Sequence, residues 1–220
     1  MCYGRKRTVQ LNKIIMKQFF FITITLITFF SCKAQTFPLY DTPNDFDVDN
    51  GYYKDLDGDL TKLIGTWQYT NGNESLKLII KKKEQDTVNA RNILYKEDVL
   101  YGEYLYIDSN GTEIVNTLSL IDTFSNIYQH SLYGNYIISK NHLPSCNDCL
   151  ENERRVEVSI EDPLRSYFNY EMIIRHIPAQ SGNPEQIKIQ IKLSDMSIVP
   201  EGQPDDDRIP THQEIILTKQ

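Results

Sequence analysis

The sequence predicts an all-β domain of about eight to nine antiparallel strands that follow one another as an up-and-down meander. Apolar and polar residues alternate in three runs, 76–80, 156–160 and 187–193. This period of two is typical of strands that have one buried and one solvated face. Turn-forming residues separate the runs, and apart from a short turn at 59–64 no segment of useful length has helical periodicity.

Each further strand is indicated by its composition and by the turn that follows it. Stretches rich in Tyr, Ile and Val predict strands at 65–70, 92–106, 112–120, 126–138, 167–177 and 212–219. Turn signals lie at 71–72, 109–111, 162–163, 181–184 and 200–210. Because most connections are short and none indicates a Greek-key crossover, a closed barrel is favoured over the alternative, a β-sandwich. The interior of an eight-stranded barrel is either filled by side chains or holds one small ligand.

Composition indicates a compact protein and argues against nucleic acid as a partner. The 220 residues are 40% hydrophobic, 24% charged and 11% aromatic, which suffices for a folded core. The formal net charge is −7. Binding to phosphates requires clustered Lys and Arg, and the sequence contains no such basic stripe.

Residues 1–31 have the pattern of a secretory signal peptide. Basic residues precede an uncharged run at 19–30, which is too short for a membrane-spanning helix of roughly 20 residues but matches the roughly 7–15-residue core of a signal peptide. A second methionine, Met16, directly precedes Lys17 and this run, and a start at Met16 would give a leader of ordinary length. We therefore expect an exported protein whose leader is not part of the fold.

The leader ends at a cysteine that predicts lipid attachment. Ser31 precedes Cys32, and this pair resembles a bacterial lipobox, in which the cysteine is acylated and becomes the new N-terminus. The alternative is ordinary secretion after cleavage at the Ala-x-Ala-like residues 32–34. Acylation at Cys32 would place the protein in the cell envelope, as an outer-membrane or periplasmic lipoprotein that contacts the membrane through this anchor. Without the leader, which holds five basic and no acidic residues, the net charge is −12.

Residues 32–58 predict an acidic tether, and residues 59–220 the β domain. Alternating aspartates and prolines without apolar periodicity are typical of a flexible, self-repelling linker. The aspartates from Asp45 onward also suggest calcium, but an EF-hand loop needs Gly at its sixth position and Glu at its twelfth. This chain has Asn50 and Leu56 there, so a solvated linker is favoured.

The single tryptophan lies in the motif Gly65-Thr66-Trp67, which is similar to the Gly-x-Trp opening strand of lipocalin-like barrels. A wider ordered series, over roughly residues 52–163, resembles a family of uncharacterised exported lipoproteins from flavobacteria. The resemblance implies an exported, lipocalin-like barrel of unknown function with Gly65 and Trp67 as its fold signature, and it offers no catalytic residue. The series comprises 65–67, 71–73, 81–83, 101–104, 116–118, 134–135, Cys146-x-x-Cys149, 153–155 and 162–163.

Cys146 and Cys149 form the most distinctive local motif. In an oxidising compartment two close thiols favour a disulfide. The alternative is a zinc site that recruits His142 and His130, although a second ligand pair at standard spacing is missing. A thioredoxin-like role would need a helix N-terminus in a βαβ context, which the sequence does not predict.

Nothing in the sequence predicts catalysis or a cofactor. It contains neither a Gly-x-Ser-x-Gly elbow nor a Gly-rich phosphate loop, and its histidines occur in unrelated contexts: His130, His142, His176 and His212. We therefore expect a non-catalytic envelope protein that binds a small apolar ligand inside the barrel or another envelope protein outside it. The alternative is an enzyme that acts on envelope or extracellular glycans through an acidic cleft, whose carboxylates the sequence does not single out.

Overall fold

The computed structural model describes residues 35–41, 46, 48–180, 182–194, 197–211 and 213–220. The chain divides into two units, Met1–Gln35 and Thr36–Gln220, and the second unit contains the strands described below. The predicted leader and Cys32 lie outside the described residues. Within the described part, no helix has both the length and the apolar character that crossing a membrane requires.

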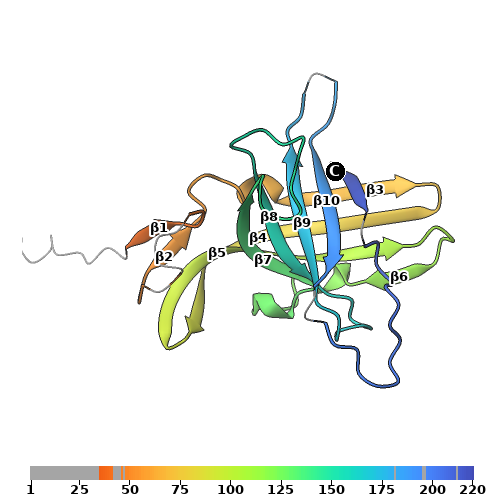
Figure 1. Ribbon diagram of the computed structural model, residues 1–220, viewed down its shortest axis with the longest axis horizontal. Coiled ribbons are helices and arrows are strands. Elements are labelled where there is room, and N and C mark those ends of the chain that lie inside the picture. Colours follow the sequence, from red (N-terminus) through yellow and green to blue (C-terminus); the bar gives the residue numbers. More distant parts are fainter. Residues whose placement is uncertain (1–34, 42–45, 47, 181, 195–196, 212) are drawn as a thin grey trace, which may run out of the picture. The chain divides into compact units, whose positions relative to one another are not determined.

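In the described residues, eleven strands form one sheet (Figure 1). Three short 3-10 turns accompany them: η1 Thr61–Leu63, η2 Leu118–Leu120 and η3 Ile127–Gln129. The strands are β1 Thr36–Pro38, β2 Tyr52–Lys54, β3 Gly65–Asn71, β4 Glu74–Ala90, β5 Ile93–Ile107, β6 Glu113–Asn116, β7 Leu132–Ser139, β8 Arg154–Ile160, β9 Tyr170–Ile177, β10 Gln186–Leu193 and β11 Glu214–Lys219.

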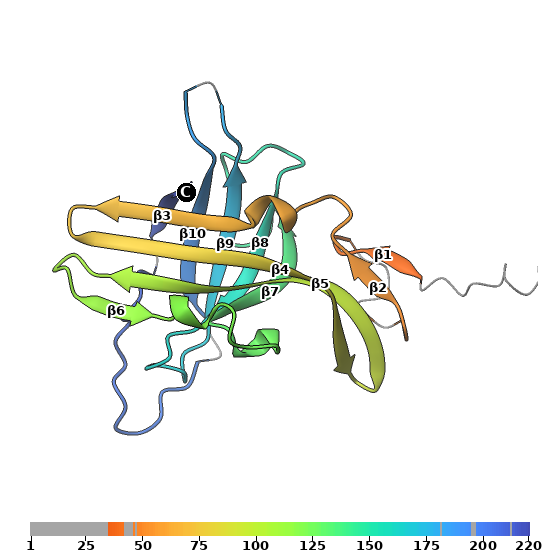
Figure 2. The same ribbon diagram turned by 180° about the vertical axis from the view of Figure 1, so that it is seen from behind.

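Eight of the strands close into a ring in chain order. β3, β4, β5, β7, β8, β9, β10 and β11 each pair with the next, and β11 pairs back with β3. All pairings in the ring are antiparallel. Strands β7 to β10 run side by side across β3, β4 and β5 in both views (Figures 1 and 2). The predicted all-β class and up-and-down meander are therefore confirmed.

The inward-facing apolar side chains of the alternating strands fill the inside of the ring. Trp67 on β3 lies opposite Leu78 on β4, which lies opposite Tyr104 on β5, and all three side chains are buried. Every strand of the ring contributes to one continuous cluster of buried apolar residues. Burying a large apolar side chain contributes about 1.5–3 kcal/mol, so this cluster is the main source of stability.

Close backbone contacts and bulges shape the ring where β5 and β7 meet. A Cβ atom on Gly102 would collide with the backbone carbonyl oxygen of Ile79. Gly134 has φ +148°, and a Cβ atom there would lie 2.9 Å from the Cα atom of Val158. The register shifts between Lys83 and Asp86 on β4 and again between 133 and 136 on β7, because each bulge inserts extra residues.

The structure differs from the expected tether over residues 36–58. β1 pairs in parallel with β2, and β2 pairs in parallel with the part of β5 that extends beyond the β4 bulge (Figure 2). Phe37 stacks on Tyr53 with 5.2 Å between ring centroids, and Tyr53 meets Tyr95 edge-on at 5.5 Å. These aromatic contacts bury side chains of a segment whose aspartates indicated a solvated linker.

The predicted strands at 112–120 and 126–138 are only partly strands. β6 ends at Asn116, and η2 and η3 follow before β7 begins at Leu132. The intervening segment covers the outer side of β5, where His130 places its Nδ1 atom 2.8 Å from Oε1 of Glu103 and packs against the ring of Tyr101. Glu103 and His130 are both buried. The segment between β6 and β7 therefore covers β5 and does not add a ninth strand to the ring.

Candidate functional site

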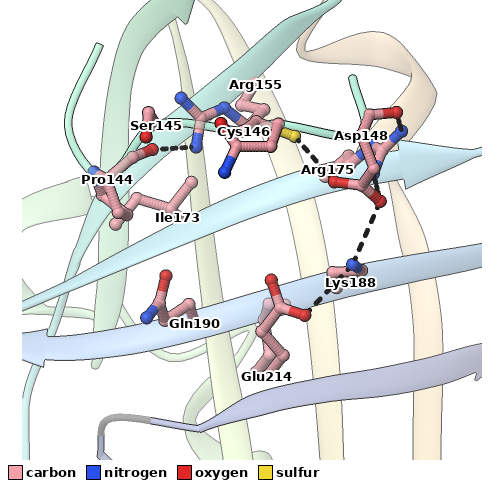
Figure 3. Close-up of a pocket in the computed structure, with 12 residues that line it drawn as sticks. Pro144, Ser145, Cys146, Asp148, Arg155, Ile173, Arg175, Lys188, Gln190 and Glu214 are labelled. Atoms are coloured by element: carbon pink, nitrogen blue, oxygen red, sulfur yellow. Dashed lines mark hydrogen bonds and ion pairs between the residues drawn. The ribbon is translucent and has the colours of Figure 1, made fainter. Parts of the chain in front are cut away.

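The connection between β7 and β8, residues 140–153, forms a loop that the two cysteines close. The structure joins Cys146 to Cys149 in a disulfide. The backbone N–H of Cys146 also donates to the carbonyl oxygen of Lys140 at 2.9 Å, and the N–H of Cys149 to that of Cys146 at 3.4 Å. We call this segment the cysteine loop. It lies over the outer face of β8, β9 and β10 (Figure 3).

Arg155, at an outward position of β8, fastens the cysteine loop to the ring. Its guanidinium donates to the carbonyl oxygen of Pro144 at 2.6 Å (Figure 3). It also donates to the carbonyl oxygens of His142 at 2.8 Å and Ser139 at 2.9 Å. The residue is 4% exposed. Burial and the positive charge of Arg175 lower the pKa of Arg155. One buried side chain thus satisfies the carbonyls of His142 and Pro144, which accept no backbone hydrogen bond within the loop.

A second arginine connects the loop to β9 through two carboxylates. Arg175 Nε lies 2.6 Å from Glu153 Oε1, and its NH1 atom lies 2.7 Å from Asp148 Oδ2. The hydrogen bond from Arg175 lowers the pKa of Asp148. Lys188 on β10 continues the network to Asp148 at 3.5 Å and to Glu214 on β11 at 3.1 Å (Figure 3). The cations of this face are therefore matched by nearby anions.

These residues surround a hollow of about 200 Å³ between the cysteine loop and the strands, which we call the loop hollow. Ile173 and Gln190 lie at its wall (Figure 3). Ligand pockets are mostly apolar, with a few polar groups free to contact the ligand. In the loop hollow the charged groups are bonded to one another or to loop carbonyls, so its chemistry suits holding the loop in place better than turning over a substrate.

The structure also shows how the candidate zinc ligands lie. One donor atom from each of Cys146, Asp148 and Cys149 falls within 4.8 Å of the others. Zinc binds thiolates, and the disulfide leaves neither sulfur in that form. His142 packs its ring edge-on against Tyr136 at 5.6 Å, and His130 contacts Glu103. The structure therefore does not bring these histidines together with thiolate ligands.

The two signature residues lie where β3 begins. Trp67 is fully buried and donates from Nε1 to the carbonyl oxygen of Leu63 in η1 at 2.9 Å. The Nζ atom of Lys219 lies 5.1 Å from the centre of the Trp67 ring. A Cβ atom on Gly65 would lie 3.1 Å from Cε of Lys219, so a residue without a side chain lets the lysine reach the ring. These contacts give Gly65 and Trp67 a structural role.

A second hollow, of about 260 Å³, was not predicted from the sequence. It lies on the outer face of β5, β7, β8 and β9, and Val99, Gly134 and Val158 contribute to its lining. Asn135 and Ser159 also line it, together with three tyrosines and three glutamates, for which we call the site the acid–tyrosine groove: Tyr128, Tyr133, Tyr136, Glu97, Glu157 and Glu171. The alternation at 156–160 placed Glu157 on the outward face, but the convergence of separate strands was not visible in the sequence.

The fold and these sites define a class of protein: a closed up-and-down ring of eight antiparallel strands, with a packed interior and polar hollows on its outer face. Within that class, the chain belongs to a protein family of unknown function, DUF6705, whose family model matches residues 16–220. No curated protein and no solved structure matches the chain. Its function must therefore be argued from its own residues.

Proposed function

We propose that this protein is an exported, non-catalytic binding module, anchored to the cell envelope by a lipid on Cys32, that engages its ligand through the outer face of the ring. The observation that carries the proposal is the packed interior. Inward side chains from all eight strands of the ring form one buried cluster, which includes residues as large as Trp67, Tyr104 and Met172. Of the two roles open to such a barrel, this packing favours recognition from outside over carriage of an apolar ligand.

The absence of an activated nucleophile in the loop hollow supports a non-catalytic role there. In the described part of this hollow, Arg155 is occupied by backbone carbonyls, and Arg175 and Lys188 by carboxylates. Groups that are committed to structural partners are not free to transfer protons to a substrate. In the acid–tyrosine groove, the negative charges of the glutamates are less fully paired with cations. This groove is therefore the better candidate for ligand contact.

The anchor is tested by metabolic labelling. The full chain, expressed in a bacterium with lipoprotein-processing enzymes and supplied with an alkyne fatty acid, is expected to incorporate label and to sediment with membranes. Cys32→Ala should lose the label and be released, whereas the matched control Cys2→Ala should retain both properties. Label that survives in Cys32→Ala, or an unlabelled protein in the medium, would overturn the proposed anchor.

The role of the interior is tested with an apolar fluorescent fatty acid. A filled ring is expected to give no saturable binding at one site per chain, because a ligand would have to displace packed side chains. Stoichiometric binding that is lost in a variant with a larger interior residue, Ile174→Phe, would show that the interior opens and would favour a carrier instead.

A glycan-acting enzyme is the second candidate, and one observation favours it. Glu97 lies in the acid–tyrosine groove with Glu157, and burial raises the pKa of Glu97, as suits a general acid. Release of reducing sugar from envelope glycans by the wild type, but not by Glu97→Gln, would establish this activity and overturn the non-catalytic role.

A further inference from the structure

The acid–tyrosine groove has a charge imbalance that the loop hollow lacks. Lys192 lies 2.8 Å from Glu171 and 3.5 Å from Glu157, and so serves two carboxylates. The longer of these contacts is to Oε2 of Glu157, a buried atom that has no closer polar partner among the described residues. Three glutamates and one lysine leave the groove with an excess of negative charge.

Glu97 is the carboxylate that most lacks a counter-charge. It is 7% exposed, lines the groove, and lies opposite Asp86 in the register of β4 and β5. Burial raises its pKa, the amide of Asn135 opposes that shift, and the carboxylates of Asp86 and Asp98 add to it. Lys83 is paired with Asp86 at 2.7 Å, and among the described residues no cation forms an ion pair with Glu97. Like charges opposite each other on neighbouring strands destabilise a sheet, and a ligand cation would relieve this repulsion.

Tyrosine rings border these carboxylates. Tyr128 meets Tyr133 edge-on with 5.4 Å between ring centroids, while Tyr128 and Tyr136 are 49% and 56% exposed. Burial raises the pKa of Tyr128, and the nearby charge of Glu97 adds to the shift, which indicates that ring and carboxylate share one environment. The face of an aromatic ring carries negative potential and attracts cations, most strongly organic ones that shed water easily.

The spacing of the glutamates and the size of the groove favour an organic cation over a metal ion. Among the described residues, these three glutamates do not form a set of three ligand atoms within 4.8 Å of one another. A hollow of about 260 Å³ instead has room for a substituted ammonium group, whose bulk can touch the rings while its charge faces the carboxylates.

We propose that the acid–tyrosine groove binds an organic ammonium group, with Glu97 as the principal counter-charge and Tyr128 and Tyr136 as aromatic walls. This inference rests on the proposed function, because it names the ligand chemistry that the outer face of the binding module recognises. A neutral ligand could stack on the tyrosines but would leave Glu97 without a counter-charge. An anionic ligand would add to the repulsion.

The test compares choline with its neutral isostere 3,3-dimethyl-1-butanol. Each is titrated at low ionic strength into the lipidated protein, purified in a non-ionic maltoside detergent, and binding is followed by calorimetry. We expect saturable binding of choline and binding of the isostere that is weaker by about tenfold or more, because the two differ only in charge. Vesicles that contain ethanolamine phospholipid, used as competitors beside phosphatidylglycerol vesicles, separate a lipid headgroup from a free amine as the source of the ammonium group.

Two variants, each of which removes one negative charge, locate the site. Glu97→Gln should weaken choline binding by about tenfold or more, since the isosteric amide keeps the shape and removes the charge. Glu214→Gln, at the loop hollow, should bind choline as the wild type does. Thermal unfolding of both variants shows that the fold is kept.

Three outcomes would overturn the assignment: equal binding of choline and its isostere, undiminished binding by folded Glu97→Gln, or no binding of choline by the wild type. If any of these outcomes occurs while Cys32 still carries its label, the groove assignment fails and the anchored module stands. If the protein binds choline but carries no lipid, the groove assignment stands and the proposed anchor fails.

Discussion

At Gly102, β5 runs so close to β4 that a side chain does not fit. The residue lies opposite Ile80 on one side and Leu132 on the other, so it belongs to both pairings at the junction of β5 with β7. In Gly102→Ala the new methyl group would meet the Ile79 carbonyl, which is backbone and cannot rotate away. We expect the free energy of unfolding to fall by about 1–3 kcal/mol, measured by urea denaturation.

Thr87→Ala is the matched control for Gly102→Ala. Thr87 is an exposed residue near the far end of β4, and surface substitutions of this kind usually change stability by less than about 0.5 kcal/mol. Equal stability of Gly102→Ala and the wild type would show that β4 and β5 are farther apart in solution than described here.

Glu185 illustrates a carboxylate that stabilises the folded state. Hydrogen bonds from Lys219 at 2.9 Å and from His176 at 2.8 Å lower the pKa of Glu185. Its contribution is therefore present above the pKa of the unfolded chain, about 4.3, and is lost as pH falls through the lower folded value. Glu185→Gln should be less stable than the wild type at pH 7, and the difference should vanish in acid. A constant difference from pH 7 to pH 3 would contradict this.

Glu97 should behave in the opposite way. Because burial raises its pKa in the folded state, and Asp86 and Asp98 add to the shift, ionised Glu97 opposes folding at neutral pH. The penalty is absent below the unfolded pKa and grows as pH rises through the folded value. Glu97→Gln should therefore be at least as stable as the wild type at pH 7, with the advantage shrinking towards pH 4. A variant that is less stable at pH 7 would show that Glu97 has a cationic partner in the folded protein.

Among the elements, the cysteine loop is held more by Arg155 than by its disulfide. The disulfide closes a very short loop, for which chain entropy gives at most about 2 kcal/mol. Removing Arg155 would leave the carbonyls of His142 and Pro144 without a donor, at about 1–3 kcal/mol for each one that water cannot reach. Denaturant unfolding should show a larger loss for Arg155→Ala than for the double variant of Cys146 and Cys149 to Ser.

Lys140→Ala is the control for the cysteine loop. Lys140 forms an exposed ion pair with Glu151 in the same loop, and such pairs contribute about 0–1 kcal/mol. If the double variant of Cys146 and Cys149 were less stable than Arg155→Ala, the loop would depend more on its disulfide than on Arg155.

Sequence periodicity located the elements whose two faces differ in polarity. The alternating runs at 76–80, 156–160 and 187–193 lie within β4, β8 and β10. It missed β1 and β2, since each has only three residues and their burial depends on aromatic contacts across the chain. It also missed the second half of β4, because the bulge after Lys83 interrupts the alternation.

The candidate sites were predictable to different degrees. Cys146 and Cys149 are close in sequence, so their pairing needed no knowledge of the fold. The alternation of β8 indicated an outward Arg155, but neither its partners in the loop nor the role of Arg175 was predictable. The acid–tyrosine groove combines β5 with β7, β8 and β9, and its members become neighbours only once the ring closes.

For the whole molecule, the ring closes at two short seams. β11 and β3 share two register pairs, and β5 and β7 share three, while β9 and β10 share eight. Amide hydrogen exchange should therefore be faster at Gln220, whose N–H donates across the seam to the Thr66 carbonyl, than at the centre of β10, because local opening breaks fewer bonds there. Equal protection, measured by mass spectrometry of peptides from both regions, would show that the ring opens only as one cooperative unit.

If Cys32 carries the proposed lipid, the early start of β1 limits how far the folded protein could stand from the membrane. Thr36 follows Cys32 by four residues, and four extended residues span at most about 14 Å. An acyl group at Cys32 would thus restrict the search for a ligand to two dimensions, close above the headgroups. Confinement of this kind gives tethered partners effective concentrations on the order of millimolar. A groove with only weak intrinsic affinity would then be occupied at the surface while staying empty in free solution.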